Sequence, residues 1–361
     1  MQKLKFYSSR NIDKTGAIYR LIIGERSNGK TYCFCKHALE GFMKNGYPSA
    51  YIRRFDTEFK RPQIRRMFNS MINETGDFQK IVKGAYDTIR FEGGIYWLIK
   101  FDEKNKIEEK TELLYTYTLN TWENDKGGDI GQVNYICYDE FCTRGKYLAD
   151  EFIAFQNTVS TIRRTRTGII IYLLANTVNE YCPLFDEFGI DITAIEQGKI
   201  YDFGNGVALE WCATSGNNSK SEYLTPFKNS RLDMIKTGAW EQAQYPHLPK
   251  NAKYDSTEFY FYINFNHKTV CGEIRQTPNG GLYIFFHYQT KPLDTTKDLI
   301  TFNQVPTTDY LAVTNITRYA PTKIHKIIVD LIRANKLFYR SNAVGEFVRN
   351  WLLWQGVVIT K

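Results

Sequence analysis

The sequence predicts an α/β chain of two domains, with a parallel sheet in the first domain and a smaller α+β domain after it. Three observations carry this prediction. A strand, a glycine-rich turn, a helix and a second strand follow one another over residues 17–55, which is the order of a βαβ unit. A nearly continuous apolar run at 168–176 has the composition of a strand covered on both faces. Short strands separated by turns take over beyond residue 249.

Length and composition exclude several classes of protein. A chain of 361 residues is enough for about two domains with a sizeable core. Hydrophobic residues at 43% and charged residues at 24% exclude a collagen-like or wholly disordered chain. No apolar run reaches the ~18 residues that span a bilayer, and residues 1–10 lack the apolar stretch of a signal peptide, so we expect neither a membrane partner nor export. Seven cysteines without a CxxC pair favour reduced, mostly buried thiols in a cytosolic protein.

The first domain, predicted over residues 1–213, is built around the βαβ unit. A β-branched strand over 17–24 ends at a glycine, a helix over 31–46 closes at a second glycine, and a strand covers 49–55. A hairpin follows, with its turn at 93–94 and a charged turn over 102–110 that has no functional explanation. A buried strand at 133–141, a helix near 148–162 and the apolar strand at 168–176 complete a parallel-core sheet.

Residues 214–248 are predicted to be a linker, because Ser, Asn, Gly and Lys dominate there and prolines flank its end. Residues 249–361 are predicted to hold antiparallel strands over 257–268, 270–277 and 282–289, and helices over 323–338 and 343–355. This second domain carries 14 Lys and Arg against eight Asp and Glu, which fits a phosphate-rich partner.

Residues 24–31 match the pattern GxxxxGK(S/T) without a mismatch and lie between a strand and a helix, the context that a Walker A phosphate-binding loop requires. Glycines let backbone N–H groups turn toward phosphate oxygens, and the helix N-terminus adds its positive end. We expect Lys30 to bridge the β- and γ-phosphates and the Thr31 hydroxyl to ligate Mg²⁺. The predicted cofactors are therefore ATP and Mg²⁺, held by Gly24, Glu25, Arg26, Ser27, Asn28, Gly29, Lys30 and Thr31.

The apolar strand at 135–138 ends in Asp139 and Glu140, the arrangement of a Walker B element. We expect Asp139 to hold Mg²⁺ and Glu140 to polarise the water that attacks the γ-phosphate. A glutamate beside this aspartate favours a P-loop NTPase of the additional-strand, catalytic-glutamate type over a nucleotide kinase or a Ras-like switch. The next strand ends at Asn176, which either contacts the γ-phosphate or the attacking water, or only caps a turn.

Two arginine clusters lie near these motifs. Arg164 and Arg166 precede the strand at 168–176, where they form either the solvated basic end of a helix or an arginine finger for a neighbouring subunit's nucleotide. Arg53 and Arg54 close the second strand, at the edge where open α/β sheets bind ligands. Three roles are open for them: sensing of the γ-phosphate, contact with nucleic acid, or structural ion pairing.

Together these features resemble the DNA-packaging (encapsidation) ATPases of small podophages that replicate by protein priming, a branch of the terminase-related ring translocases. The resemblance covers most of the chain. It rests on Arg26 in the Walker A loop, YxRR at 51–54, VKG at 82–84, DEF at 139–141, and the arginine-rich stretch before Asn176. In the second domain, GLYI within 280–284 and the Thr-Asn pair at 314–315 are also similar.

The resemblance implies a motor that couples Mg-ATP hydrolysis to translocation of double-stranded DNA into a procapsid. It implies a homo-oligomeric ring of five subunits, with packaging RNA and the portal protein as partners, at the portal vertex in the host cytoplasm. Within the site it implies that Arg164, with Arg166 close behind, acts in trans. For such a motor we also expect Arg26 and Arg53 to contact the γ-phosphate. The second domain is implied to be an RNase-H-like, vestigial nuclease.

Two alternatives are open. A nuclease-competent terminase needs converging carboxylates in the second domain, where Glu258 and Glu273 are a candidate pair. A nucleic-acid-binding scaffold needs a degenerate ATP site, and the intact motifs argue against it. Because 55–58 is acidic where the family tends to carry a lysine, any trans-acting lysine is unassigned. Candidates for DNA contact are 60–66 and loops within 83–130, for which a solvated face is an equal explanation.

Overall fold

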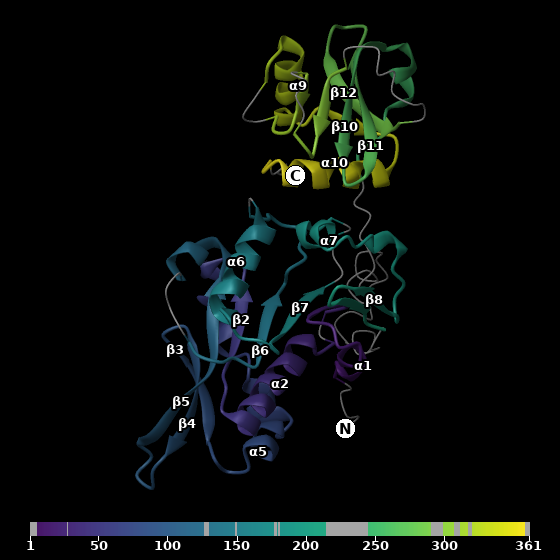
Figure 1. Cartoon of the computed structure of the whole chain (residues 1–361). Helices are drawn as coiled ribbons and strands as arrows, with labels where there is room; N and C mark the ends of the chain where they lie inside the picture. The colour runs from purple at the N-terminus through teal and green to yellow at the C-terminus, as the bar shows by residue number, and fades with distance from the viewer. Residues whose placement is uncertain are drawn as a thin grey trace, which may run out of the picture. The chain divides into compact units, whose positions relative to one another are not determined.

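The computed structural model describes residues 6–26, 28–125, 130–148, 150–176, 179, 181–213, 245–289, 299–306, 311–316 and 320–357. The chain divides into two compact units, one of 1–144 with 150–241 and one of 145–149 with 242–361 (Figure 1). Most of the predicted linker, residues 214–244, lies outside the described residues. No helix in the described ranges is both long and apolar enough to cross a membrane.

The first unit contains a nine-stranded sheet, as far as its described residues show, in the order β3-β4-β5-β2-β6-β7-β1-β9-β8. Six neighbouring strands, in the order β5-β2-β6-β7-β1-β9, pair in parallel. At one edge β4 pairs antiparallel with β5 and β3 with β4, and at the other edge β8 pairs antiparallel with β9. The prediction of a mixed α/β fold with a parallel-rich sheet is confirmed. In chain order the strands are β1 (Tyr19–Gly24), β2 (Ser49–Arg53), β3 (Thr88–Glu92), β4 (Ile95–Phe101), β5 (Ile107–Thr118), β6 (Tyr135–Asp139), β7 (Ile170–Asn176), β8 (Ile200–Gly204) and β9 (Val207–Trp211).

The two long helices of this unit are α2 (Lys30–Asn45), which ends at Gly46 in the left-handed conformation as predicted, and α6 (Glu151–Arg163). The short helices α1, α3, α4, α5 and α7 surround them. Their bounds are Arg10–Asp13, Asp56–Phe59, Pro62–Arg65, Asp77–Val82 and Pro183–Glu187. A π-helical turn covers Ser70–Glu74, a 3-10 turn covers Ile192–Ala194, and a kinked 3-10 segment covers Leu119–Asp125.

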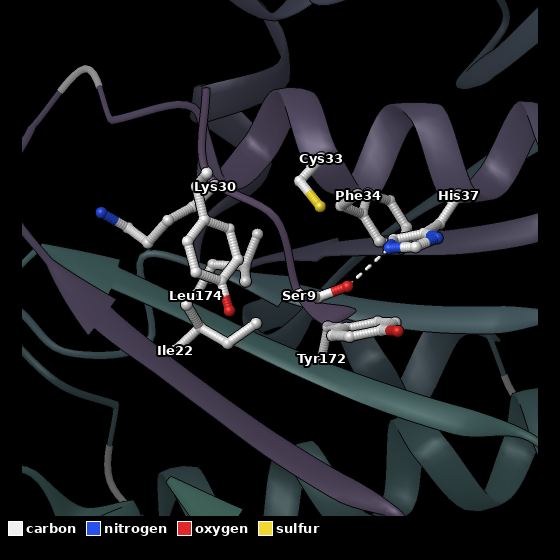
Figure 2. Close-up of a pocket in the computed structure, with 9 residues that line it drawn as sticks. Ser9, Ile22, Lys30, Cys33, Phe34, His37, Tyr172 and Leu174 are labelled. Atoms are coloured by element: carbon white, nitrogen blue, oxygen red, sulfur yellow. Dashed lines mark hydrogen bonds between the residues drawn. The ribbon is translucent and has the colours of Figure 1, made fainter. Parts of the chain in front are cut away.

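The N-terminal segment packs between α2 and the sheet. The Ser9 hydroxyl donates to the Asp13 carboxylate at 2.7 Å. It also lies 2.7 Å from Nε2 of His37, whose ring stacks on Tyr172 (Figure 2). The void that these side chains line with Lys30 and its neighbours leaves no room for a water molecule. These side chains are therefore packed together as part of the core.

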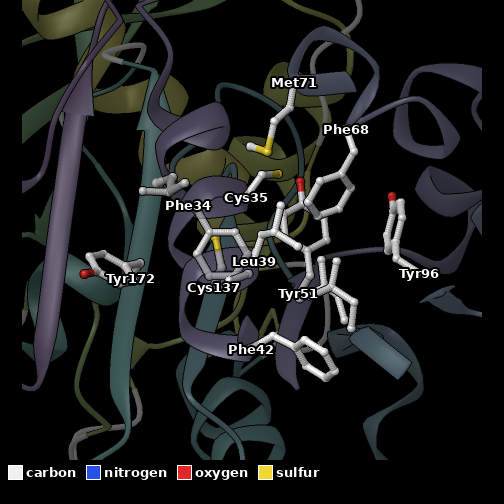
Figure 3. Packing of buried hydrophobic residues seen from close by; sticks show 14 of the residues in the cluster. Phe34, Cys35, Leu39, Phe42, Tyr51, Phe68, Met71, Tyr96, Cys137 and Tyr172 are labelled. Atoms are coloured by element: carbon white, nitrogen blue, oxygen red, sulfur yellow. The ribbon is translucent and has the colours of Figure 1, made fainter. Parts of the chain in front are cut away.

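The core explains the apolar strands of the sequence. Cys137 of β6 joins the buried cluster beneath α2, with Phe34 and Tyr172 (Figure 3). The next residue, Tyr138, points to the other face and stacks on Phe155 of α6. Since successive residues of a strand face opposite sides, a strand between two helical layers must be apolar throughout. The seven cysteines are free and six of them are buried, which confirms the prediction that they are mostly buried and outside disulfides.

Two details of the first unit differ from the predictions. The strands of the βαβ unit are not neighbours, because β6 and β7 lie between β1 and β2. The charged turn predicted over 102–110 is wrong beyond Lys106, because β5 begins at Ile107 and pairs with β4. The first four residues of β5, 107–110, are all exposed, so charges on both faces of the sheet are tolerated there. Lys110, for example, pairs with Glu92 at 2.7 Å.

The second unit contains a six-stranded sheet in its described residues, in the order β14-β13-β10-β11-β12-β15. Strands β10, β11 and β12 are antiparallel, while β13 and β14 on one side and β15 on the other are parallel to their neighbours. The bounds are β10 (Ser256–Phe265), β11 (Lys268–Gln276), β12 (Leu282–Tyr288), β13 (Thr301–Asn303), β14 (Ala312–Val313), β15 (Leu337–Tyr339), α9 (Lys323–Arg333) and α10 (Asn342–Trp354), with one 3-10 turn at Lys250–Tyr254.

Aromatic side chains form the core of this second unit. Phe261 makes edge-to-face contacts with Phe286 and Phe302, and Trp351 of α10 covers Phe302. Opposite Phe261 lies Gly272, where a Cβ atom would be 2.3 Å from the Phe261 ring, so this pairing requires glycine. The three long strands and both helices are as predicted, except that the predicted helix over 323–338 ends at Arg333 and Leu337 begins β15.

Candidate nucleotide-binding site

All the predicted site residues that the structure describes, except the finger residues Arg164 and Arg166, lie where the parallel strands end. Gly24 closes β1, Asp139 closes β6 and Asn176 closes β7, with Gly24 and Asn176 directly paired. Arg53 closes β2, the neighbour of β6. Because parallel strands share one carboxyl edge, residues far apart in the sequence lie together here.

The loop between β1 and α2 depends on its two glycines. Gly29 has a φ of 93°, in the left-handed region, and a Cβ atom there would be 2.8 Å from the Phe6 ring. A Cβ atom on Gly24 would be 2.9 Å from that of Cys212. Glu25 is buried, Arg26 is exposed, and Ser27 lies outside the described residues. The glycine spacing in the sequence therefore reflects close packing as well as backbone turning.

The Lys30 ammonium group is folded over its own loop. Its Nζ donates to the carbonyls of Glu25 at 2.8 Å and Gly24 at 3.3 Å. It also donates to Oδ1 of Asn28 at 3.1 Å and of Asn176 at 3.4 Å. Burial lowers the pKa of Lys30, and nearby acidic side chains partly oppose that shift. A buried cation held mainly by neutral oxygens is well prepared to exchange them for phosphate oxygens.

Thr31 and Asp139 lie together as the predicted Mg²⁺ ligands should. The Thr31 hydroxyl donates to Oδ2 of Asp139 at 3.1 Å. The same oxygen accepts from the Tyr51 hydroxyl at 2.6 Å. Burial and then the Asp139 charge raise the pKa of Tyr51 well above its usual value, so Tyr51 remains a donor. A hydroxyl and a carboxylate oxygen are the hard ligands that Mg²⁺ prefers, so this pair fits the ion.

Arg53 is ion-paired with three carboxylates. Its guanidinium lies 2.6 Å from Glu58, 2.8 Å from Glu140 and 3.5 Å from Asp139, and its side chain is 5% exposed. Burial alone would lower the pKa of Arg53, but the surrounding groups more than offset this and raise it. Arg53 therefore holds both carboxylates at the end of β6, and of its three open roles ion pairing is the one formed in this arrangement.

Arg54 ties the site to the second helical layer. It makes a two-point ion pair with Glu151 of α6 at 2.8 and 2.9 Å, and both side chains are buried. It also donates to the carbonyls of Glu140 at 3.1 Å and Phe141 at 2.7 Å. The Tyr138 hydroxyl donates to Glu151 at 2.7 Å. Arg54 is therefore a structural residue that fixes the chain just after the Walker B strand.

Glu140 has a position suited to a catalytic base. Its φ of 59° lies in the left-handed region, which turns the chain sharply at the end of β6. The Glu140 side chain is 50% exposed, whereas that of Asp139 is 11% exposed. The strand end thus buries one carboxylate beside Thr31 and presents the other to solvent, where a water molecule can reach it.

The predicted finger residues are not part of this group. Arg164 follows α6 and, with Arg166, precedes β7, whose opposite end carries Asn176. Arg164 is exposed and has a φ of 49°. Because β6 and β7 are parallel, the α6–β7 connection lies at the amino edge of the sheet, away from the same chain's Thr31 and Asp139.

The candidate nuclease residues of the second unit have other partners. Glu273 accepts a hydrogen bond from Thr257 at 3.1 Å and pairs with His287 at 3.0 Å. Glu258 accepts one from Ser256 at 2.6 Å. In the described parts of the chain, no three His, Cys, Asp or Glu side chains are grouped so that they could hold a metal ion.

The pair of His287 with Glu273 predicts a pH-dependent stability. Side-chain hydrogen bonds to Cys271 and Glu273 raise the pKa of His287 to about 10, and the His287 bond lowers the pKa of Glu273. His287 therefore stabilises the folded state fully below its unfolded pKa of 6.5, and this stabilisation is lost as the pH rises toward 10. Glu273 stabilises the folded state above its unfolded pKa of 4.5. We expect His287→Gln to lower Tm most near pH 6 and least near pH 10, in thermal melts of the full chain. The exposed His267→Gln should show no such trend, and a deficit independent of pH would contradict the ion pair.

Comparisons with known proteins agree with this fold. The chain is 24% identical over 205 residues to the DNA packaging protein of Bacillus phage phi29, covering 56% of this chain and 55% of that protein. It is 29% identical over 177 residues to the DNA packaging protein of Bacillus phage B103, covering 48% of each. The chain thus spans about half the length of the curated relatives it matches.

Two solved structures share the fold over nearly the whole chain. The structure of the Phi-28 gp11 DNA packaging motor has a TM-score of 0.57 at 17% identity, covering 99% of this chain and all of that one. The bacteriophage Phi-29 viral genome packaging motor assembly has a TM-score of 0.55 at 18% identity, covering 96% and 99%. The profile of the Podovirus DNA encapsidation protein (Gp16) family matches residues 1–333, and the chain therefore belongs to that family.

Proposed function

We propose that this protein is the ATPase of a viral DNA-packaging motor, which couples hydrolysis of Mg-ATP to movement of double-stranded DNA into a procapsid. The observation that carries the proposal is the Thr31–Asp139 contact of 3.1 Å, which joins Walker A to Walker B beside the buried Lys30. Strand β7 lies between the strands that carry these motifs, which supports the additional-strand, catalytic-glutamate class. Membership of the encapsidation family supports DNA as the substrate.

Each site residue has a distinct proposed role. Lys30 and the backbone N–H groups of 24–31 bind the phosphates, while Thr31 and Asp139 hold Mg²⁺, which neutralises phosphate charge. Glu140 accepts a proton from the attacking water. Asn176 contacts the γ-phosphate through an amide already within 3.4 Å of Lys30, and Arg26 contacts the nucleotide from the exposed turn of the loop.

The second domain is proposed to dock the motor rather than to cut DNA. The antiparallel strands β10, β11 and β12, with the parallel strands β13 and β14 next to β10, support an RNase-H-like fold. Glu273 is neutralised by His287 instead of facing a second carboxylate, which supports the vestigial-nuclease proposal. The excess of basic residues in the second domain suits binding to packaging RNA, which would place the motor at the portal vertex inside the host cell.

The proposed ring is tested by complementation between two inactive variants. Arg164 lies away from its own chain's site, so a finger there must act on a neighbouring subunit. We expect Arg164→Ala alone to lose at least about 10³-fold in DNA-dependent turnover, within the range measured for arginine fingers. Mixing it with Glu140→Gln should restore part of that turnover, because some interfaces then pair an intact finger with an intact glutamate. Phosphate release across a wide range of protein concentration is the measurement.

A matched control is Arg10→Ala, an exposed arginine of α1 outside the site, which should behave as wild type. Activity that does not depend on protein concentration or DNA, and that Arg164→Ala leaves unchanged, would favour a monomeric NTPase or a scaffold instead.

A further inference from the structure

We infer that Arg61, Arg65 and Arg66 contact DNA phosphates, and that Glu58 and Phe59 connect this surface to the Walker B carboxylates. The inference rests on the proposed motor function and assigns the DNA-contacting residues that the sequence left open. The sequence from Lys60 to Arg66 holds four basic residues and no acidic one. It directly follows α3, which begins three residues after β2 ends at the nucleotide site.

The three arginines are exposed and have no partner in the described part of the chain. Each is solvent-exposed, and none forms an ion pair or a side-chain hydrogen bond with a described residue. Lys60, by contrast, pairs with Asp56 at 3.4 Å. Another exposed pair of basic residues, Lys104 and Lys106, lies between acidic residues at 102–103 and 108–109 and is balanced by them. The positive charge left over at Arg61, Arg65 and Arg66 is therefore available to an anionic partner.

The backbone that carries these arginines is firmly held. Tyr96 donates to the carbonyl of Ile64 at 2.5 Å, and Ile64 packs against the core of the first unit. Phe68, one turn further, is 2% exposed and lies against Tyr96. Helix α4 and the residue before it thus present Arg65 and Arg61 from a backbone that is fixed to the core. This suits a surface that must transmit force to bound DNA.

Two links lead from this surface to the nucleotide site. Glu58 of α3 lies 2.6 Å from Arg53, which in turn holds Glu140 and Asp139. Phe59 packs edge-to-face on Tyr51, whose hydroxyl donates to Asp139. A shift of α3 therefore changes the contacts of both Walker B carboxylates. Conversely, when Glu140 turns toward an attacking water, Arg53 loses one of its three carboxylates and its contact with Glu58 of α3 strengthens.

The DNA contact is tested by charge removal. We expect the triple variant Arg61→Gln, Arg65→Gln, Arg66→Gln to reduce the slope of log K against log salt by about 2.7, because each phosphate contact contributes about 0.9. The measurement is anisotropy of a labelled duplex titrated with the full chain between about 50 and 200 mM salt. Replacing the same residues with lysine should keep the slope, which separates charge from folding. Glutamine at the exposed Lys44, Lys104 and Lys106 is the matched control and should leave the slope near that of wild type.

The link is tested with Glu58→Gln. We expect wild-type DNA affinity but a smaller ratio of DNA-stimulated to basal ATP turnover, a separation that a general folding defect would not produce. A wild-type ratio in this variant overturns the link.

If wild-type turnover is stimulated by DNA while the triple glutamine variant keeps the wild-type salt slope, the arginine surface is wrong and the motor function stands. If the wild-type protein neither binds duplex DNA nor changes its ATP turnover with DNA, both the DNA contact of these arginines and the proposed motor function are wrong. Loss of affinity for an RNA hairpin alone would reassign the surface to RNA.

Discussion

Replacing Glu140 with glutamine is expected to lower ATP turnover by about 10² to 10⁴-fold, the usual contribution of a general base, while ATP still binds. Glu140 is the half-exposed carboxylate at the end of β6, next to the buried Asp139 that faces Thr31. Glutamine keeps a side-chain oxygen that can accept from Arg53, so the ion-pair network loses charge but not shape. Phosphate release, with binding of a fluorescent ATP analogue measured in parallel, separates catalysis from affinity.

The matched control for this variant is Glu40→Gln, an exposed glutamate on α2 outside the site. It should hydrolyse ATP at the wild-type rate. Both variants need to be assayed with DNA and over a range of protein concentration, because a shared active site depends on subunit association. Turnover of Glu140→Gln within tenfold of wild type would place the general base elsewhere.

Replacing Arg54 with methionine is expected to lower the free energy of unfolding of the first unit by about 3–5 kcal/mol, because it leaves the buried Glu151 carboxylate without its ion-pair partner. Glu151 is 1% exposed and its two carboxylate oxygens face Arg54. The carbonyls of Glu140 and Phe141 lose donors at the same time. Urea unfolding of the full chain, followed by tryptophan fluorescence, measures the change.

A second variant separates the stranded charge from lost packing. Arg54→Met combined with Glu151→Leu removes both charges, and we expect it to recover much of the loss, since apolar replacement of a buried ion pair is often neutral. Recovery should be incomplete because the Tyr138 hydroxyl also loses its acceptor. Arg61→Met, at an exposed position, should change stability by no more than about 0.5 kcal/mol. An Arg54→Met variant as stable as this control would contradict the structural role of Arg54.

Much of the nucleotide site was predictable because its parts are contiguous in the chain. A phosphate-binding loop needs glycines, a lysine and a hydroxyl at fixed spacing between a strand and a helix, and residues 24–31 meet that need locally. The apolar run into Asp139 and Glu140 is equally local. The strands and helices around these motifs were predictable for the same reason, since periodicity and closing glycines act over a few residues.

Other members of the site were not predictable, because their roles depend on which strands are neighbours. Tyr51 reads as an ordinary strand residue, yet the pairing of β2 with β6 brings its hydroxyl to Asp139. Glu58 reads as an exposed acid and instead completes the ion pairs of Arg53. The YxRR pattern at 51–54 indicated that this strand end has a function, but it did not decide between nucleotide sensing, nucleic-acid contact and ion pairing for its arginines.

The amino-acid sequence by itself determined the glycine-rich turn between β1 and α2, the adjacent carboxylates Asp139 and Glu140 at a strand end, and the parallel-rich class of the sheet, because each follows from spacing over a few residues. Only the tertiary structure decided how two adjacent arginines differ. Arg53 and Arg54 alternate across β2 and its continuation, so one meets Glu140 and the other meets Glu151, 97 residues away on α6. Such pairings depend on strand order and on the helical layers around the sheet, which no local pattern of residues specifies.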